Sequence, residues 1–172
     1  EFAEENVAME ALVEKHCERF VLGSREMVLD ELIAYASGSG SKDYVCLTGA
    51  PGSGKSALLA YLSQHPDLRA QPSTLIIRHF VGASPGSTNM RRTLRRLCHE
   101  LKADCTDTTT EIPDDPEKLR RAFRDFLWKA CEKKRIMILL DAVNQFDFAS
   151  HSTGLEWLPE KLPPNARVIL SA

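Results

Sequence analysis

The sequence predicts an α/β fold in three layers, with a mostly parallel sheet of at least four strands between helices. Short apolar runs of strand length alternate along the chain with segments whose apolar residues recur at helical spacing. The runs are nearly continuous rather than alternating, as in strands that are covered on both faces. The length of 172 residues fits one ordinary domain with a single core.

The first part of the chain predicts two helices and a strand. Apolar residues recur at helical spacing over residues 4–19 and 25–36, and Ser24 is the expected N-cap of the second helix. The Gly- and Ser-rich residues 37–42 predict a flexible connection. The apolar run at 44–48 then predicts the first strand.

The middle of the chain continues the alternation. Residues 54–63 are helical in character, and 74–81 predict a second strand. Ser87 or Thr88 is the expected cap of a helix with an apolar stripe, formed by Met90, Leu94, Leu97 and Leu101.

The last part supplies a helix and two strands. Asp115 as N-cap and Pro116 at the first helical position predict an amphipathic helix. The run 135–141 predicts a buried strand that ends in an acid, and 167–172 predict a final strand after a proline turn. Because no turn or polar tail follows that strand, we expect the chain to be cut there.

Composition and charge exclude several classes of protein. The net charge of −2 provides no global basic field, so a nucleic-acid partner is not expected. The sequence has no long apolar run and no basic leader, which predicts a soluble chain without a membrane span. Its five cysteines are odd in number and scattered, which favours a reducing, cytoplasmic compartment; Cys46 and Cys98 are expected to be small buried hydrophobes, and Cys105 lies in a polar loop.

The strongest motif is a full G-x-x-x-x-G-K-[ST] pattern between a predicted strand and a predicted helix. Its glycines let the backbone wrap with the N–H groups pointing inward, and the helix that follows adds its positive end. Lys55 would reach the terminal phosphates, and the Ser56 hydroxyl would bind Mg²⁺. The expected phosphate-binding residues are Gly49, Ala50, Pro51, Gly52, Ser53, Gly54, Lys55, Ser56 and Ala57.

A magnesium–phosphate site also needs a carboxylate at the end of a neighbouring strand, and Asp141 fits. The next residues supply no second acid at once, because Asn144 and Gln145 can orient a water but cannot take its proton, and Asp147 is the nearest remaining carboxylate. With Lys55, Asp141 and Asn144 as the catalytic candidates, we expect at most a weak ATPase. A GTPase would want glycine where Asn144 stands, so an adenine nucleotide is favoured.

Two other features have competing interpretations. Arg91, Arg92, Arg95 and Arg96 lie opposite or beside the apolar stripe of their helix, which predicts a solvated face; a protein-interaction face or an arginine reaching a neighbouring subunit's nucleotide are the alternatives. His79 ends the second strand, where it is either a structural histidine or a group near the γ-phosphate.

Several segments together resemble the STAND P-loop ATPases. They are GAPGSGKS, HFVGAS leading into LRRLC, ILLDAVNQF, and EWLPEKLP before RVILSA. Over residues 20–172 the chain is most similar to NACHT-type domains of the nephrocystin, telomerase-associated-protein and NACHT-WD-repeat branch.

The resemblance implies a signalling switch that holds ADP at rest and ATP when active, with self-oligomerisation and protein partners bound through domains outside this chain. It also implies that residues near Val21 and Gly23 cover the adenine, although an extra residue precedes Arg25 here. Ser171 falls near the family's sensor position, and Asn144 replaces a usual acid. The expected division is a helical segment over 1–40 and a P-loop core over 41–172 that lacks its last strand and helical lid.

Two other functions remain open at this stage. A small-molecule or nucleotide kinase would need an acceptor pocket and an Arg-rich lid, which nothing after Asp141 supplies. A degenerate protein-interaction domain would bind no nucleotide, and the intact Lys55 and Ser56 argue against it.

Overall fold

The structure is a computed structural model that describes residues 2–38, 44–71, 73–103, 110–147 and 154–172. Most of the connection expected at 37–42, and the loop with Cys105, lie outside these ranges.

The described strands form one wholly parallel sheet in the order β1-β4-β3-β2. Their bounds are β1 Tyr44–Leu47, β2 Thr74–Phe80, β3 Arg135–Asp141 and β4 Ala166–Ser171. In the register, Phe80 lies opposite Asp141 and Leu47 lies opposite Ser171. The carboxyl ends of the strands therefore meet along one edge of the sheet, where ligands bind in open α/β folds.

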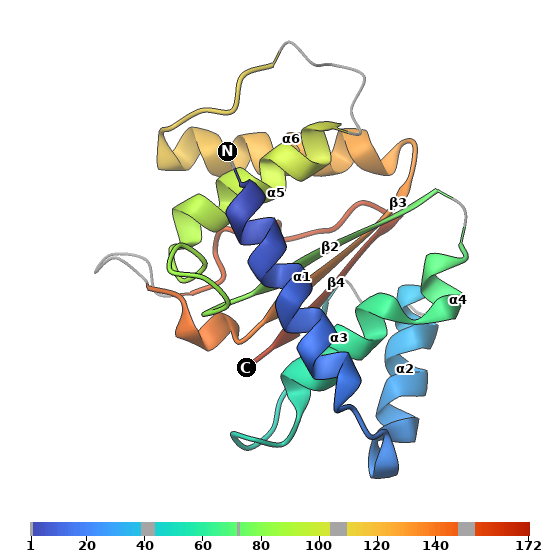
Figure 1. Ribbon diagram of the computed structural model, residues 1–172. Coiled ribbons are helices and arrows are strands. Elements are labelled where there is room, and N and C mark those ends of the chain that lie inside the picture. Colours follow the sequence, from blue (N-terminus) through green and yellow to red (C-terminus); the bar gives the residue numbers. More distant parts are fainter. Residues whose placement is uncertain (1, 39–43, 72, 104–109, 148–153) are drawn as a thin grey trace.

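Helices cover both faces of this sheet (Figure 1). On one face lie α1 (Ala3–Glu18), α2 (Glu26–Ala36), α3 (Lys55–Gln64) and the short α4 (Pro66–Arg69). On the other lie α5 (Met90–Ala103) and α6 (Pro116–Cys131). Each face has its own apolar core, so strands such as β3 are buried on both sides and read as continuous apolar runs. The predicted three-layer α/β fold is confirmed.

The helix caps agree with the sequence in one place and differ in two. Asp115 caps α6 as predicted, since its Oδ1 accepts from the Lys118 amide at 3.0 Å. Ser24 was the wrong cap, because it lies inside a 3₁₀ turn (Gly23–Arg25) and α2 starts at Glu26 without a side-chain cap.

The cap of α5 is Asn89 rather than Ser87 or Thr88. Asn89 Oδ1 accepts from the Arg92 amide at 2.9 Å. The Ser87 hydroxyl instead accepts from the amides of Gly82 and Ser84, at 2.9 and 3.1 Å, and thereby closes the loop before the helix.

The two cysteines expected in the core have different surroundings. Cys98 lies on the buried face of α5, and burial raises the pKa of its thiol to about 12 although Arg95 opposes the shift. The prediction for Cys46 is wrong, since its side chain is exposed. Within the described sheet β1 is an end strand, paired with β4 alone, which leaves one side of it without a neighbour.

No described helix combines the length and the apolar character needed to cross a bilayer.

Candidate nucleotide-binding site

The glycine-rich loop connects β1 to α3 and turns back on itself at two glycines. Gly52 and Gly54 have φ values of +77° and +87°, in the left-handed region that L side chains rarely adopt. The Ser53 amide donates to the Ala50 carbonyl at 3.1 Å, which closes the turn. Gly54 is the N-cap of α3, so the helix points its free amides and positive end into the loop.

The Lys55 amine lies over the mouth of this loop. It donates to the carbonyl oxygens of Gly49 at 2.6 Å and Ala50 at 3.3 Å. An ammonium group held there by neutral carbonyls keeps its full charge available to an anion in the loop. The geometry fits a bound phosphate chain.

Arg25 crosses the loop from outside and is a site residue to which the sequence analysis gave no role. Its Nε and Nη2 donate to the Ser53 carbonyl at 3.3 and 3.1 Å, and Nη1 donates to the Val21 carbonyl at 2.9 Å. A Cβ on Gly54 would lie 2.9 Å from Nη2, so this position also needs glycine to admit the guanidinium. The only sequence signal was the position of Arg25 beside the segment that resembles an adenine-covering motif.

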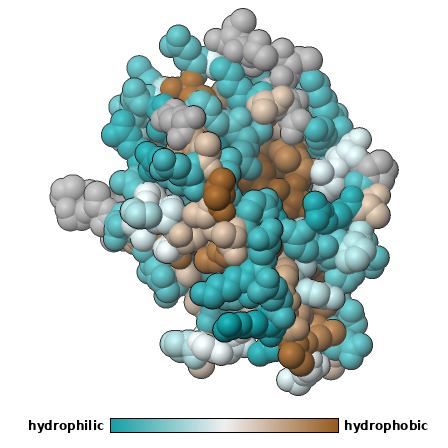
Figure 2. Space-filling view, viewed as in Figure 1, coloured by the Kyte–Doolittle hydropathy of each residue, from teal (hydrophilic) through white to brown (hydrophobic). Residues whose placement is uncertain are grey.

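Apolar side chains are exposed next to this arginine. Val21 and Met27 are 73% and 76% exposed. Figure 2 shows apolar surface at the bottom of the molecule, where Figure 1 places the start of α2. Because Arg25 connects Val21 to the loop, this surface adjoins the glycine-rich turn and could take the face of a flat ring.

Asp141 ends β3 and is held by Ser171 at the end of β4. The Ser171 hydroxyl donates to Asp141 Oδ1 at 2.5 Å and accepts from the Ala142 amide at 2.9 Å. Asp141 is 5% exposed. Since β4 separates β1 from β3, the acid lies two strand spacings, about 10 Å, from the end of β1.

Those residues fit a magnesium ion bound to phosphate. Within the described part of the chain, neither Asp141 Oδ2 nor the Ser56 hydroxyl has a hydrogen-bond partner, so both oxygens are available as hard ligands.

The segment after Asp141 is bent by an unusual backbone. Ala142 has a φ of +54°, and a 3₁₀ turn at Val143–Gln145 follows. Asn144 is exposed there. Asp147 is engaged elsewhere: its Oδ2 accepts from the Thr88 hydroxyl at 2.6 Å. The hydrogen bond holds the loop before α5, and it engages the carboxylate that is nearest to Asp141 in the sequence after Asn144.

A family model described as an AAA ATPase domain matches residues 22–170. The chain belongs to the AAA ATPase domain family. The domain is 28% identical over 159 residues to NACHT and WD repeat domain-containing protein 2 of Mus musculus, covering 89% of this chain and 8% of the relative. It is 35% identical over 129 residues to nephrocystin-3 of Homo sapiens, covering 73% of this chain and 9% of the relative.

A TPR repeat-containing protein of Dictyostelium discoideum is 28% identical over 170 residues, with 77% of this chain and 10% of that relative covered. The chain thus spans about a tenth or less of the length of these relatives. No solved structure gives a significant match. The matches and the fold confirm the predicted NACHT-type P-loop NTPase.

His79 of this ATPase domain has a structural position. It is wholly buried, its Nε2 lies 2.8 Å from the Ser87 carbonyl, and Arg96 Nη2 lies 3.2 Å from its Nδ1. Since a guanidinium can only donate, Nδ1 accepts and Nε2 carries the proton. Burial, and secondly the Arg96 charge, lower the pKa of His79 to about 4, so the ring is neutral at pH 7.

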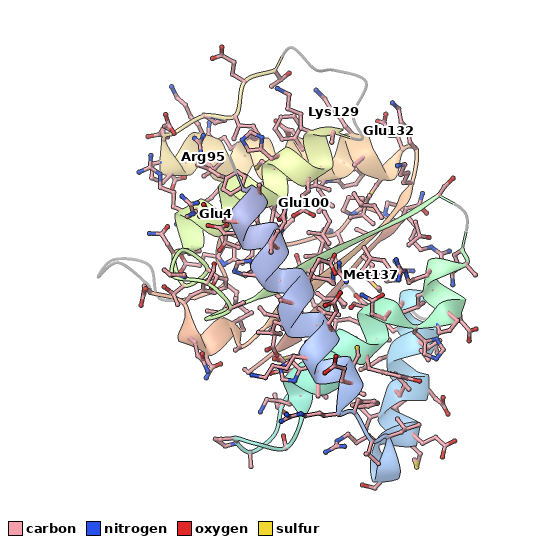
Figure 3. The ribbon with its side chains drawn as sticks, in the orientation of Figure 1. Glu4, Arg95, Glu100, Lys129, Glu132 and Met137 are labelled. Carbon is pink, nitrogen blue, oxygen red and sulfur yellow. The ribbon has the colours of Figure 1, made fainter. Side chains whose placement is uncertain are left out.

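The prediction of a solvated arginine face is wrong for Arg96. Its side chain is 3% exposed and donates to the Arg78 carbonyl at 2.6 Å, to Asn6 Oδ1 at 3.3 Å and to Glu100. Figure 3 places Glu100 in the space between α5 and α1. Because the first residues of α1 lie beside α5, Arg96 faces protein rather than water. Arg91, with a side chain 53% exposed, does lie on a solvated face.

Proposed function

We propose that this chain is the ATP/ADP-responsive switch module of a larger signalling or scaffold protein. It binds adenine nucleotide with Mg²⁺, hydrolyses ATP slowly, and thereby controls conformation and self-association. The observation that carries the proposal is a complete G-x-x-x-x-G-K-[ST] loop at the sheet edge where Asp141 ends β3, without a second acid directly after Asp141.

The loop supplies the affinity. Its inward amides, the N-terminal end of α3 and the Lys55 ammonium all favour an anion, and Ser56 and Asp141 would hold the metal. A bound Mg²⁺ would neutralise charge on the β- and γ-phosphates. The exposed Val21 and Met27 beside Arg25 give an adenine ring an apolar surface, with Gly23 in the same turn.

The slow turnover follows from the residues near Asp141. The side chain of Asn144 can orient a water but has no basicity for its proton. The Asp147 carboxylate is engaged with Thr88. We therefore expect turnover on the order of once per hour, far below the ~10 s⁻¹ typical of enzymes.

The names of the matched relatives suggest what the rest of the protein binds. Two of the matched proteins are named for WD or TPR repeats, and the chain spans only a small part of each. We infer that the segments outside this chain bind other proteins, and that the nucleotide state of the module sets whether they do so.

Calorimetric titration of the chain with Mg-ATP and Mg-ADP tests the proposal. We expect micromolar dissociation constants for both, and loss of about 100-fold or more in Lys55→Ala, because in the proposed complex the amine would contact the phosphates directly. Lys133→Ala removes an exposed lysine elsewhere and should bind as the wild type.

The rate of phosphate release under saturating ATP tests the second claim of the proposal, that hydrolysis is slow. Rapid hydrolysis that Asp141→Asn abolishes would contradict the slow-switch assignment. Turnover that appears only with a small-molecule acceptor would indicate a kinase instead, and an unchanged melting temperature in millimolar Mg-ATP and Mg-ADP would indicate a domain without nucleotide binding.

A further inference from the structure

The outer edge of β2 is only partly covered. The Ser73 carbonyl accepts from the Arg135 amide, and the Val81 amide donates to the Asp141 carbonyl, so odd-numbered residues of this strand bond to β3. Alternation along a strand then directs the other main-chain groups outward. The outward residues are Thr74, Ile76, Arg78 and Phe80.

The carboxyl half of this edge is closed by side chains. The Phe80 amide donates to Met9 Sδ at 3.3 Å, and the Arg78 carbonyl accepts from Arg96 at 2.6 Å. Toward the start of the strand, no described group bonds to the main chain of Ile76 or to the amide of Arg78. An open strand edge is a template for another chain.

A small cavity of about 210 Å³ lies beside the open part. It is lined by Ser63, Arg69, Thr74, Ile76 and Arg78, with no acid among these residues. The Thr74 hydroxyl is buried without a partner among the described residues. The volume is below the roughly 300–1,000 Å³ of small-molecule pockets, so it suits one side chain rather than a second nucleotide.

Both guanidiniums line this cavity and have N–H groups beyond those in the described hydrogen bonds. Arg69 donates through Nη1 to Gln64 Oε1 at 2.5 Å, and Arg78 pairs with Glu10 through Nη2. Each guanidinium has five N–H groups, of which these bonds use few. Three acids lie nearby. Glu10 and Glu14 line an adjoining cavity of about 380 Å³ on the α1 side, and Glu100 lines, with Glu10, a second one of about 240 Å³ that also borders Ile76 and Arg78. The charged side chains that line the cavity at the start of β2 are therefore both cations, and the acids line the neighbouring cavities.

We propose that the edge of β2 at Thr74–Arg78 binds an extended segment of a partner protein, which adds a strand to the sheet and places an acidic side chain beside Arg69 and Arg78. Side chains of an added strand alternate between the faces of the sheet, so every second one falls on the face that holds the cavity. A carboxylate there would accept from both guanidiniums and from the Thr74 hydroxyl. This site is at the amino half of β2, away from the phosphate loop, and does not depend on nucleotide binding.

The test begins with selection of a phage-displayed library of random nine-residue peptides against the chain. The selected peptides are then synthesised with a fluorescent label and titrated by anisotropy. We expect enrichment of an Asp or Glu flanked by β-branched or aromatic residues. Binding should weaken by about tenfold or more in Arg69→Gln, which removes an exposed guanidinium, and stay unchanged in Arg121→Gln on α6.

Hydrogen exchange separates strand addition from simple anion binding. A peptide that adds a strand should protect the amides of Ile76 and Arg78 from exchange. Perturbation by inorganic phosphate alone, without that protection, would show a free-anion site and overturn the proposal. Selection that yields no peptide, no acidic preference, or peptides indifferent to Arg69→Gln would overturn it as well.

Discussion

Two polar clusters lie near the carboxyl ends of strands in this sheet, and they differ in what their polar groups contact. At the ends of β1, β3 and β4, the Lys55 amine donates to carbonyls of its own loop, and Asp141 keeps an oxygen without a described partner. At the end of β2, His79 and Arg96 are buried and bonded to neighbouring protein groups. Residue types typical of active sites occur in both, so the presence of spare donors and acceptors distinguishes a binding site from a structural cluster.

Among the substitutions considered, Arg96→Met should lower the free energy of unfolding the most, because it disrupts the cluster around His79. It leaves Glu100, the Arg78 carbonyl and His79 Nδ1 without their partner, and removal of one member of a buried charged pair costs about 3–5 kcal/mol. The free energy of unfolding from urea denaturation measures this. The control, Arg91→Met, changes an exposed arginine of the same helix and should stay within about 0.5 kcal/mol of the wild type. Equal effects of the two variants would show that Arg96 is not structural.

The pH dependence of stability sharpens the assignment of His79. Its pKa in the folded state is about 4 against an ordinary 6.5, so between these values the unfolded chain binds the additional proton. The stability that neutral His79 contributes is therefore present above pH 6.5 and is lost as pH falls toward 4, by about 3 kcal/mol.

Urea denaturation at pH 7 and pH 4.5 tests this contribution. Wild type should lose more stability than His79→Gln over that interval, because only the wild type must protonate this residue on unfolding. His16→Gln, on the partly exposed face of α1, should behave as the wild type. Identical slopes for His79→Gln and wild type would contradict a buried neutral ring.

Arg25 should affect nucleotide affinity more than stability. Arg25→Ala removes the bonds to the Ser53 and Val21 carbonyls, which frees the loop, and we expect Mg-ADP affinity to fall about tenfold. Arg25→Lys keeps the charge but cannot form the same fork, so it should recover only part of the loss. Full recovery by lysine in calorimetric titration would show that charge alone matters.

The smallest expected effect is at Ala142. Its φ of +54° costs a non-glycine residue about 1–2 kcal/mol, which exceeds the entropic cost of glycine in the unfolded state. Ala142→Gly should therefore raise the free energy of unfolding by about 0.5 kcal/mol. Ala122→Gly, in the middle of α6, should lower it by about 1 kcal/mol. A destabilised Ala142→Gly would indicate that the methyl group packs favourably there.

Patterns of residues close together in the sequence predicted most of the strands and helices and the glycine-rich loop. Buried strands such as β3 are continuous apolar runs, and the phosphate loop is determined by glycines close together in sequence. Such patterns do not predict contacts between segments that are distant in the sequence. Arg96 is buried because α1 packs against α5 and β2. The spacing of apolar residues within α5 does not indicate that α1 covers this side of the helix.

Two other predictions were wrong for different reasons. Cys46 is exposed because β1 is an end strand of the described sheet, whereas its apolar run resembles that of a central strand. Ser87 was a plausible helix cap, but its hydroxyl bonds to the preceding loop and Asn89 takes the cap position.

The most direct test of the contrast is a map of backbone amide chemical shifts on titration with Mg-ATP. We predict large changes at Gly52, Gly54 and Lys55 and at the ends of β3 and β4, with little change at His79 and Arg96. Changes centred on the His79 and Arg96 cluster, with none in the phosphate loop, would contradict the assignment of one cluster to nucleotide binding and the other to structure.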